Sequence, residues 1–271
     1  MDEQVYERLY QVEDWHWWFR GRRAVIHAML DRVGLPQSPR ILDAGCGTGR
    51  NLVEFSSLGR AQGVDTSAQA VEFCRRRGLD EVQVGSLNSL PFEDSSFELI
   101  LLADVLEHVE DDLGALRELK RVGAGDARLV ITVPAYRWMW SKHDVSHHHH
   151  RRYTRKQLRE LVREAGWEPT VATYFNSMLL PPIALLRMLA RRGSPKGRDD
   201  VDLTPGPLNS VLGLPMQLEA RLIRIGARFP AGVSVGLVCR PGPEARPQSE
   251  ESSMEESSTE DSPLRPSLTS S

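Results

Sequence analysis

Residues 40–52 have the sequence RILDAGCGTGRNL, in which a short apolar segment leads into a glycine-rich turn and the start of a helix. Gly45, Gly47 and Gly49 stand at alternate positions, so the backbone can bend sharply and a ligand can approach it closely. A dinucleotide-binding turn would need its third glycine at position 50, where this chain has Arg50. The turn also lacks the Lys and Ser or Thr of a phosphate-binding loop. It predicts a site for a nucleotide-like ligand without a pyrophosphate clamp, which argues against a nicotinamide oxidoreductase.

Strand-like and helix-like segments alternate around this turn. Strands are expected at residues 40–42, 61–64, 82–84, 97–103, 128–133, 170–175 and 233–240. Helices are expected at residues 51–58, 68–77, 111–122 and 154–165. Residues 97–103 form a continuous apolar run, which is typical of a strand buried on both faces. The alternation predicts an α/β fold with a mostly parallel sheet and helices on both faces.

Three further segments belong to the expected organisation. Residues 1–35 carry apolar residues at helical spacing and predict an N-terminal helical cap. Residues 176–232 are too long for a simple connection and predict a helical insertion before the last strand, within a domain of residues 36–243. Residues 244–271 hold seven acidic residues, two arginines and few apolar side chains, so a disordered acidic tail is expected there.

The composition excludes several classes of protein. The 271 residues are 40% hydrophobic and 26% charged, with a net charge of −3, as in ordinary globular chains. Without the acidic tail the chain is only weakly basic, which does not favour nucleic acid as a partner. Three scattered cysteines support neither a disulfide framework nor a cysteine-based zinc site. No membrane span and no secretory signal are expected, so the predicted location is cytoplasmic.

The N-terminal cap contains Trp15, Trp17 and Trp18 close to Phe19 and Arg20. The aromatic rings either cover the core or form a lid over a ligand. Covering the core is the favoured interpretation, since large aromatic side chains bury more apolar surface than any others.

Asp65 ends the second expected strand, directly after Gly63 and Val64. The carboxyl ends of parallel strands meet at one edge of an open sheet, and an acid there can accept hydrogen bonds from both hydroxyls of a ribose. Ser86 and Leu87 follow the third strand at the same edge. The glycine turn, this acid and the third segment occur in the order expected for a nucleoside site.

Four segments together resemble the class I S-adenosylmethionine-dependent methyltransferases, in particular their small-molecule branch with its quinone-biosynthesis enzymes: residues 41–51, 63–65, 90–97 and 104–108. The resemblance implies a Rossmann-like sheet of seven strands whose last strand is antiparallel, and S-adenosylmethionine as cofactor. It also implies that the glycine turn holds the methionine part, Asp65 the ribose, and the residues after the third strand the adenine. Cofactor contacts are thus expected from Asp43, Ala44, Gly45, Cys46, Gly47, Gly49, Asp65, Thr66, Ser86, Leu87 and Ala103. The family often has Asp where this chain has Ser86.

Residues 136–154 follow the fifth strand and are rich in aromatic and basic side chains. They resemble a bacterial subgroup of these methyltransferases with a W-S-x-H-D…H-x-R-R-Y-T signature, whose members often accompany sugar and envelope-polymer biosynthesis. The resemblance extends to residues 17–20 and 174–177. It implies a small-molecule, glycan or lipid-linked acceptor bound next to the methyl group.

Histidine is the commonest general base near neutral pH. The expected catalytic groups are therefore His143 with Asp144, or His149. Substrate contacts are expected from Arg151, Arg152, Tyr153 and His108. The two arginines could hold a carboxylate or phosphate through paired hydrogen bonds, and His108 either packs in the sheet or faces the acceptor.

The run His147–His150 raises the question of a metal ion. Consecutive residues rarely point at one centre, and no cysteine or carboxylate set accompanies the run in the sequence. No metal site is therefore expected.

Residues 178–192 are apolar and end in Arg187, Arg191 and Arg192. Such a segment either packs on the sheet as a helical lid or lies at the surface of the inner membrane, with arginines at the headgroups. The sequence as a whole predicts a methyltransferase. A cofactor-binding but non-catalytic protein, acting at a membrane surface or in an enzyme complex, is the alternative.

Overall fold

The computed structural model of the chain describes residues 3–192 and 206–243. Seven strands form one sheet: β1 Arg40–Ala44, β2 Arg60–Asp65, β3 Val82–Val84, β4 Phe97–Ala103, β5 Gly123–Pro134, β6 Trp167–Phe175 and β7 Ser234–Pro241. The helices of the described ranges are α1 Glu3–Val12, α2 Trp17–Leu30, α3 Arg50–Phe55, α4 Ala68–Arg76, α5 Asp112–Val122, α6 Lys142–Ser146, α7 Arg155–Glu164, α8 Leu180–Arg192 and α9 Gly206–Arg224. Two 3₁₀ turns, η1 Leu106–His108 and η2 Arg137–Met139, follow β4 and β5.

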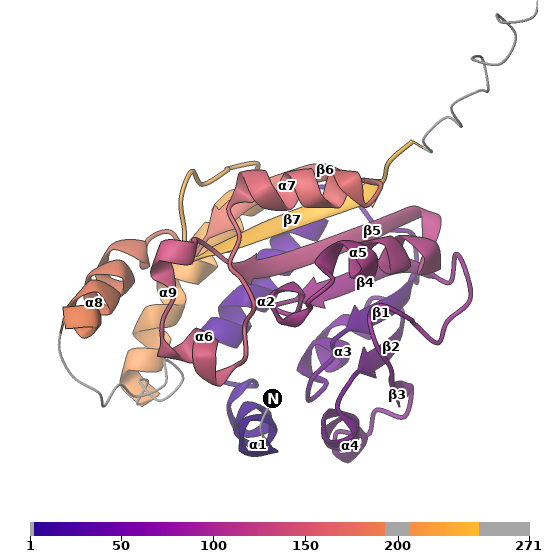
Figure 1. Ribbon diagram of the computed structural model, residues 1–271, viewed down its shortest axis with the longest axis horizontal. Coiled ribbons are helices and arrows are strands. Elements are labelled where there is room, and N and C mark those ends of the chain that lie inside the picture. Colours follow the sequence, from indigo (N-terminus) through magenta and orange to yellow (C-terminus); the bar gives the residue numbers. More distant parts are fainter. Residues whose placement is uncertain (1–2, 193–205, 244–271) are drawn as a thin grey trace, which may run out of the picture.

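The strand order is β3-β2-β1-β4-β5-β7-β6 (Figure 1). All neighbouring pairs are parallel except those of β7, which runs antiparallel to both β5 and β6. The predicted Rossmann-like sheet of seven strands with an antiparallel last strand is confirmed. The order reverses direction after β1, and in sheets of this kind ligands bind at the carboxyl ends of the strands beside such a switch point.

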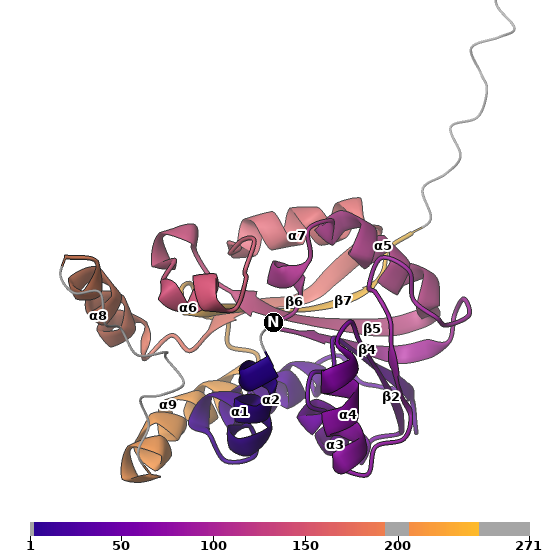
Figure 2. The ribbon, with the colours of Figure 1, turned by 60° about the horizontal axis from the view of Figure 1, so that its bottom comes forward.

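The central strand β4 shows why the sheet needs helices on both faces. Leu99 and Leu101 pack on one side with residues of α2 and α9, whereas Ile100 and Leu102 pack on the other with residues of α5 and α7. Figure 2 shows these two layers, with α5 and α7 on one side of the sheet and α1, α2, α3, α4 and α9 on the other. The apolar run at residues 97–103 is a strand buried on both faces, as predicted.

Most element boundaries match those expected from sequence within a few residues. The helix expected at 51–58 ends earlier, because α3 stops at Phe55 and a turn follows. The fifth strand begins at Gly123 rather than at residue 128, because Gly123 pairs with Phe97 before an irregularity in the β4–β5 register. Glycine and aspartate have low strand propensity, so the sequence hides this early start.

The N-terminal helices and the insertion pack against each other. Asn209 of α9 accepts a hydrogen bond from the Trp17 amide (2.6 Å) and donates one to the Trp15 carbonyl (2.9 Å). The Trp18 ring stacks on Phe175 with 6.0 Å between ring centroids. Trp17 and Trp18 thus cover the core, whereas Trp15 is exposed.

Helices α8 and α9 lie in the segment expected to be a helical insertion. None of the helices within residues 3–192 and 206–243 is long and apolar enough to cross a bilayer. The acidic tail expected at 244–271 lies outside the described residues, as do the side chains of Arg191 and Arg192.

Candidate active site

The glycine turn (residues 45–49) joins β1 to α3 at the switch point of the sheet. Gly45, Gly47 and Gly49 have φ angles of +79°, +53° and +86°, which side-chain-bearing residues rarely adopt. A Cβ atom on Gly45 would lie 2.6 Å from the methyl carbons of Val105, just beyond β4. The Gly45 amide donates to the Val64 carbonyl of β2 (2.8 Å). The turn is therefore wedged between the ends of β2 and β4.

Asp65 connects the end of β2 to this turn. One carboxylate oxygen accepts a hydrogen bond from the Gly47 amide and the other from the Ser67 amide, both at 2.9 Å. Burial raises the pKa of Asp65, and these amides partly oppose the shift. Tyr6 of α1 lies over the same strand end, where burial and the nearby Asp65 charge raise its pKa to about 12. Helix α1 thus covers the edge at which a ribose is expected.

Asp43 lies beneath the turn and is fully buried. Neither carboxylate oxygen has a hydrogen-bond partner within the described part of the chain. Burial raises the pKa of Asp43 to about 7, and the positive charge of Arg22 opposes this. Arg22 reaches in from α2 and donates to the Asp104 carboxylate (2.7 Å), but its own Nε is also buried without a partner there. Buried polar atoms of this kind normally pair with something, so the arrangement fits a polar ligand.

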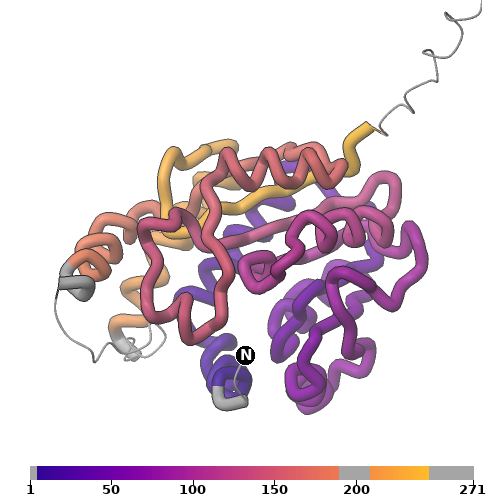
Figure 3. The backbone as a smooth tube through the Cα atoms, in the orientation of Figure 1, coloured from indigo at the N-terminus to yellow at the C-terminus, as the bar shows by residue number. Residues whose placement is uncertain are grey.

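The β5–α7 loop (residues 135–154) extends from the same edge of the sheet, and Figure 3 traces it as a long excursion that includes α6. The loop is bonded to η1, the turn that follows β4. The His150 amide donates to the Glu107 carbonyl (2.8 Å), and the Tyr153 hydroxyl donates to the Leu106 carbonyl (3.4 Å) and to Asp112 (2.8 Å). These bonds fix the loop against the end of β4.

Asp144 is the buried centre of this loop. It accepts hydrogen bonds from the Ser141 amide (2.7 Å), from Nε and Nη2 of Arg152 (2.7 and 3.0 Å) and from Nδ1 of His149 (2.8 Å). Burial alone would raise the pKa of Asp144, but the bonds from His149 and Arg152 hold it well below its usual range. Asp144 is therefore a carboxylate, and His149 must donate to it from Nδ1. This leaves Nε2 of His149 as the ring atom for other chemistry.

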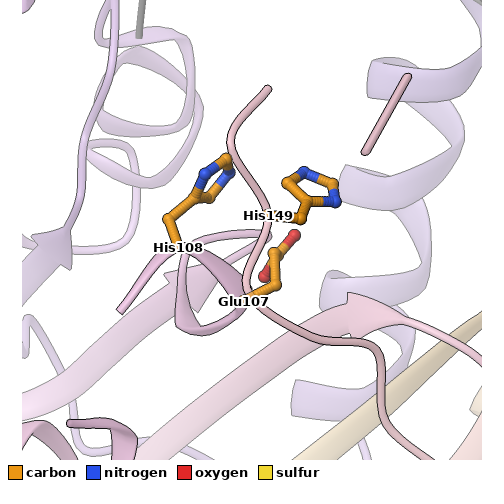
Figure 4. A group of neighbouring side chains, drawn as sticks. All are labelled: Glu107, His108 and His149. Carbon is orange, nitrogen blue, oxygen red and sulfur yellow. The ribbon is translucent and has the colours of Figure 1, made fainter. Parts of the chain in front are cut away.

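Histidines from the two segments meet next to Glu107. The rings of His108 and His149 are nearly perpendicular, with centroids 4.6 Å apart. Burial lowers the pKa of His108 to about 3, so its ring is neutral. Glu107, His108 and His149, named here the Glu–His cluster, place one ligand-type atom each within 4.8 Å of one another (Figure 4).

Comparison with known proteins identifies the family. The sequence model described as the methyltransferase domain matches residues 42–131. A demethylmenaquinone methyltransferase of Roseiflexus sp. is 30% identical over 168 residues, which cover 58% of this chain and 67% of that protein. The chain belongs to the class I S-adenosylmethionine-dependent methyltransferases.

Other similarities of the chain cover different shares of the proteins that it matches. A norajmaline N-methyltransferase of Rauvolfia serpentina is 34% identical over 36% of this chain and 36% of its own length. The chain spans only 35–39% of the length of the first curated relatives that it matches. An S-adenosylmethionine-dependent methyltransferase of Thermotoga maritima superposes with a TM-score of 0.55 at 19% identity, covering 88% of this chain and 95% of that one. This last similarity concerns the fold alone.

The cofactor of the family, S-adenosylmethionine, fits the residues at the glycine turn. The space beside Gly47 is open, and the unpaired oxygens of Asp43 lie next to the turn that the family uses for the methionine part. Asp65 stands at the predicted ribose position. Leu87 is buried and Ser86 is exposed, its hydroxyl accepting from the Asn88 amide (3.3 Å).

Of the remaining predicted cofactor residues, some lie at the carboxyl ends of the strands and one lies in the core. Ala44 and Ala103 end β1 and β4, and the Ala103 carbonyl accepts a hydrogen bond from Arg22 (3.4 Å). Thr66 is exposed beside Asp65. Cys46 is buried with its sulfur 3.9 Å from that of Cys74, which fits a small core residue.

Two of the predicted substrate contacts have partners within the protein. Arg152 is buried, and Nε, Nη1 and Nη2 bond to Asp144 and to the Ala135 carbonyl, so it holds the loop in place. Tyr153 is likewise buried, with its hydroxyl on Asp112. Arg151 pairs with the same Asp112 (2.8 Å) and is only partly exposed.

The predicted catalytic residues are grouped differently from the expectation. The histidine that bonds to Asp144 is His149, five residues later in the chain. The ring centroid of His143 lies 5.8 Å from that of His149. The sequence could have shown the position of Asp144, because Ser141-x-x-Asp144 is a capping-box pattern and forms one at the start of α6. Arg22 and Glu107 were not predicted as site residues, and no local motif marks the place of Arg22.

Proposed function

We propose that this methyltransferase transfers the methyl group of S-adenosylmethionine to a hydroxyl of a small-molecule, glycan or lipid-linked acceptor. The observation that supports this most directly is the position of Val105. Its side chain packs against the glycine turn, and the Glu–His cluster begins two residues later at Glu107. Groups suited to holding an acceptor oxygen thus begin two residues after the side chain that packs on the expected donor turn, which supports the proposal.

Bound S-adenosylmethionine supplies an electrophilic methyl group on a sulfonium. Transfer is an in-line displacement, so the protein must above all position the acceptor opposite the sulfur. The β5–α7 loop is suited to that task because its buried Asp144–Arg152 pair fixes the orientation of His149. A neutral imidazole can also take the proton of a hydroxyl as it attacks the methyl carbon.

The exposed side chains of helices α8 and α9 favour one class of acceptor. Leu185, Leu186 and Met188 of α8 are exposed, as are Leu214 and Leu218 of α9. Figure 1 shows both helices projecting from one end of the sheet. The apolar face they expose supports a lipid-linked acceptor presented at a membrane surface, in keeping with an envelope-polymer role.

Helix α8 is also tied to the loop that holds the acceptor. Arg187 donates a hydrogen bond to the Met139 carbonyl of η2 (2.7 Å). A lipid surface that binds α8 would therefore lie close to the β5–α7 loop, and α8 would not have to move to bring it there.

A direct assay tests the main proposal. The chain is incubated with S-adenosylmethionine and polyprenyl-linked or free hydroxylated acceptors, and release of S-adenosylhomocysteine is measured. Calorimetry first establishes that the folded chain binds S-adenosylhomocysteine. Absence of binding would contradict the proposal. Binding without release for any acceptor would favour the non-catalytic partner instead.

Vesicle sedimentation tests the membrane contact. Leu185→Ser combined with Leu186→Ser should reduce binding to anionic phospholipid vesicles. Val145→Ser, which changes an equally exposed apolar residue on α6, is the matched control and should leave binding unchanged. Equal binding by all variants would contradict a role of α8 at the membrane.

A further inference from the structure

The Glu–His cluster has the ligand set of a metal centre. It combines one carboxylate and two imidazoles, contributed by η1 and by the β5–α7 loop (Figure 4). Bonds of about 2.0–2.2 Å to zinc put neighbouring ligand atoms roughly 3–3.5 Å apart. The three groups lie within 4.8 Å of one another, so small side-chain rotations would bring them onto one ion.

The surroundings of Glu107 leave it in need of a cation. Its side chain is only 1% exposed, and its Oε2 has no hydrogen-bond partner among residues 3–192 and 206–243. The Asp104 carboxylate lies nearby and adds negative charge, while the two arginines whose charge opposes it, Arg22 and Arg152, bond to Asp104 and Asp144 and not to Glu107. A buried carboxylate without a partner is costly, and a bound metal ion would supply one.

Asp144 gives His149 the orientation that metal ligands have. In metal sites, a ligating histidine usually donates its other ring N–H to a carboxylate or carbonyl. Nδ1 of His149 donates to Asp144 at 2.8 Å, and the fork of Arg152 holds that carboxylate in place. Nε2 of His149 is thereby left for the ion.

We propose that Glu107, His108 and His149 bind a divalent metal ion of the zinc type, which takes the acceptor oxygen as a further ligand. Three protein ligands and an open position are the usual arrangement of catalytic zinc. The sequence argued against a metal because no carboxylate accompanies the histidine run. The structure brings Glu107 to one histidine of that run, from more than 40 positions earlier in the chain.

The ion would act on the acceptor, not on the donor, and this inference rests on the proposed methyl transfer. A hydroxyl bound through its oxygen becomes more acidic and gives its proton to solvent water. The oxygen then forms the new O–CH₃ bond, the S–CH₃ electron pair returns to sulfur, and S-adenosylhomocysteine leaves. Neither an oxidant nor a reductant is required.

Zinc titration of the metal-free full chain tests the site, with a chromophoric chelator as competitor. One Zn²⁺ per chain should bind, and His108→Ala or His149→Ala should weaken binding by more than about 100-fold, the upper limit for losing an outer partner. Asp144→Asn should weaken it by about 10–100-fold. Thermal melting and S-adenosylhomocysteine binding show that each variant is folded.

The exposed neighbours His148 and His150 provide the matched control. His148→Ala combined with His150→Ala should leave zinc affinity unchanged. If this variant loses as much affinity as His149→Ala, or if His108→Ala has no effect, zinc binds the surface run and the proposal is wrong. If the chain binds no zinc yet still releases S-adenosylhomocysteine, only the metal site fails. If it binds zinc but not S-adenosylhomocysteine, only the methyltransferase proposal fails.

Discussion

The glycine turn between β1 and α3 is shaped largely by backbone groups, whereas the β5–α7 loop is held by buried side chains that pair across the chain. In the turn, positive φ angles and amides bonded to Val64 and Asp65 set the geometry. In the loop, Asp144 gathers Arg152 and His149, and Tyr153 reaches back to Asp112. A site built from backbone depends on a few glycines close in sequence. A site built from paired side chains depends on every partner.

This difference predicts that a substitution in the β5–α7 loop can abolish turnover without changing the affinity for the methyl donor. His149→Ala should lower turnover by about 10²–10⁴-fold, the usual contribution of a group that helps to remove the acceptor's proton, here as a ligand of the proposed ion. The affinity for S-adenosylhomocysteine should stay within about twofold, because His149 belongs to the loop. Steady-state kinetics and calorimetry on the same preparation measure both. His148→Ala, its exposed neighbour, is the control. Parallel loss of cofactor affinity would show that the loop covers the donor.

Replacing Arg22 should affect the donor site and the acceptor site together. It bonds to Asp104 and its charge acts on both Asp43 and Glu107, so it serves the two halves at once. Arg22→Met should destabilise the fold by about 3 kcal/mol, since removing one partner leaves buried carboxylates uncompensated. Cofactor affinity and turnover should both fall. Chemical denaturation, calorimetry and kinetics check the three effects, and Arg20→Met, an exposed neighbour on α2, should show none.

Asp65→Ala should act on the donor side alone. Both carboxylate oxygens hold backbone amides, and the predicted ribose contact would be lost as well. Affinity for S-adenosylhomocysteine should fall by about 1–3 kcal/mol, the cost of leaving buried hydrogen-bonding groups unpaired. Zinc affinity should not change. A loss of S-adenosylhomocysteine affinity of less than twofold would contradict the ribose assignment. A loss of zinc affinity would show that the donor and acceptor sites depend on each other.

The same difference explains what could be predicted from the sequence. The strand at residues 97–103 and the turn at Gly45–Gly49 were found because their patterns are local: an apolar run and alternating glycines. The helix expected at residues 154–165 is α7, and Thr154 and Gln157 form a capping box at its start, which is another local pattern. Backbone features of this kind follow from short stretches of chain.

Pairings over long distances could not be found in this way. Nothing in the sequence near His149 indicates that Glu107 lies beside it, because the contact exists only once β4 and β5 are paired in register. Arg152 was expected to bind an anion because a guanidinium group can hold a carboxylate or phosphate through paired hydrogen bonds. Only the structure shows that Arg152 is buried and that three of its five N–H donors bond to Asp144 and to the Ala135 carbonyl.

The smallest expected effect concerns Asp43 and pH. Burial raises its pKa from 3.8 to about 7, so the side chain is mostly protonated below neutral pH in the free protein. A raised folded-state pKa means that Asp43 favours folding fully below pH 3.8, and that this contribution is lost as the pH rises to about 7. The amino-acid part of S-adenosylhomocysteine carries an α-ammonium group, whose positive charge beside Asp43 would favour the ionised form of that side chain. Binding should then release a proton.

Affinity for S-adenosylhomocysteine should therefore rise by up to about tenfold per pH unit below pH 7 and level off above it. Calorimetry in buffers of different ionisation enthalpy counts the proton released. Asp43→Asn cannot ionise, so its affinity should be nearly independent of pH over the same range, and it should bind more weakly than the wild type at pH 8. If the affinity of Asp43→Asn depends on pH as that of the wild type does, another group is the one that titrates. A pH dependence of turnover that persists in this variant would then belong to the β5–α7 loop, where His149 and its neighbours act on the acceptor.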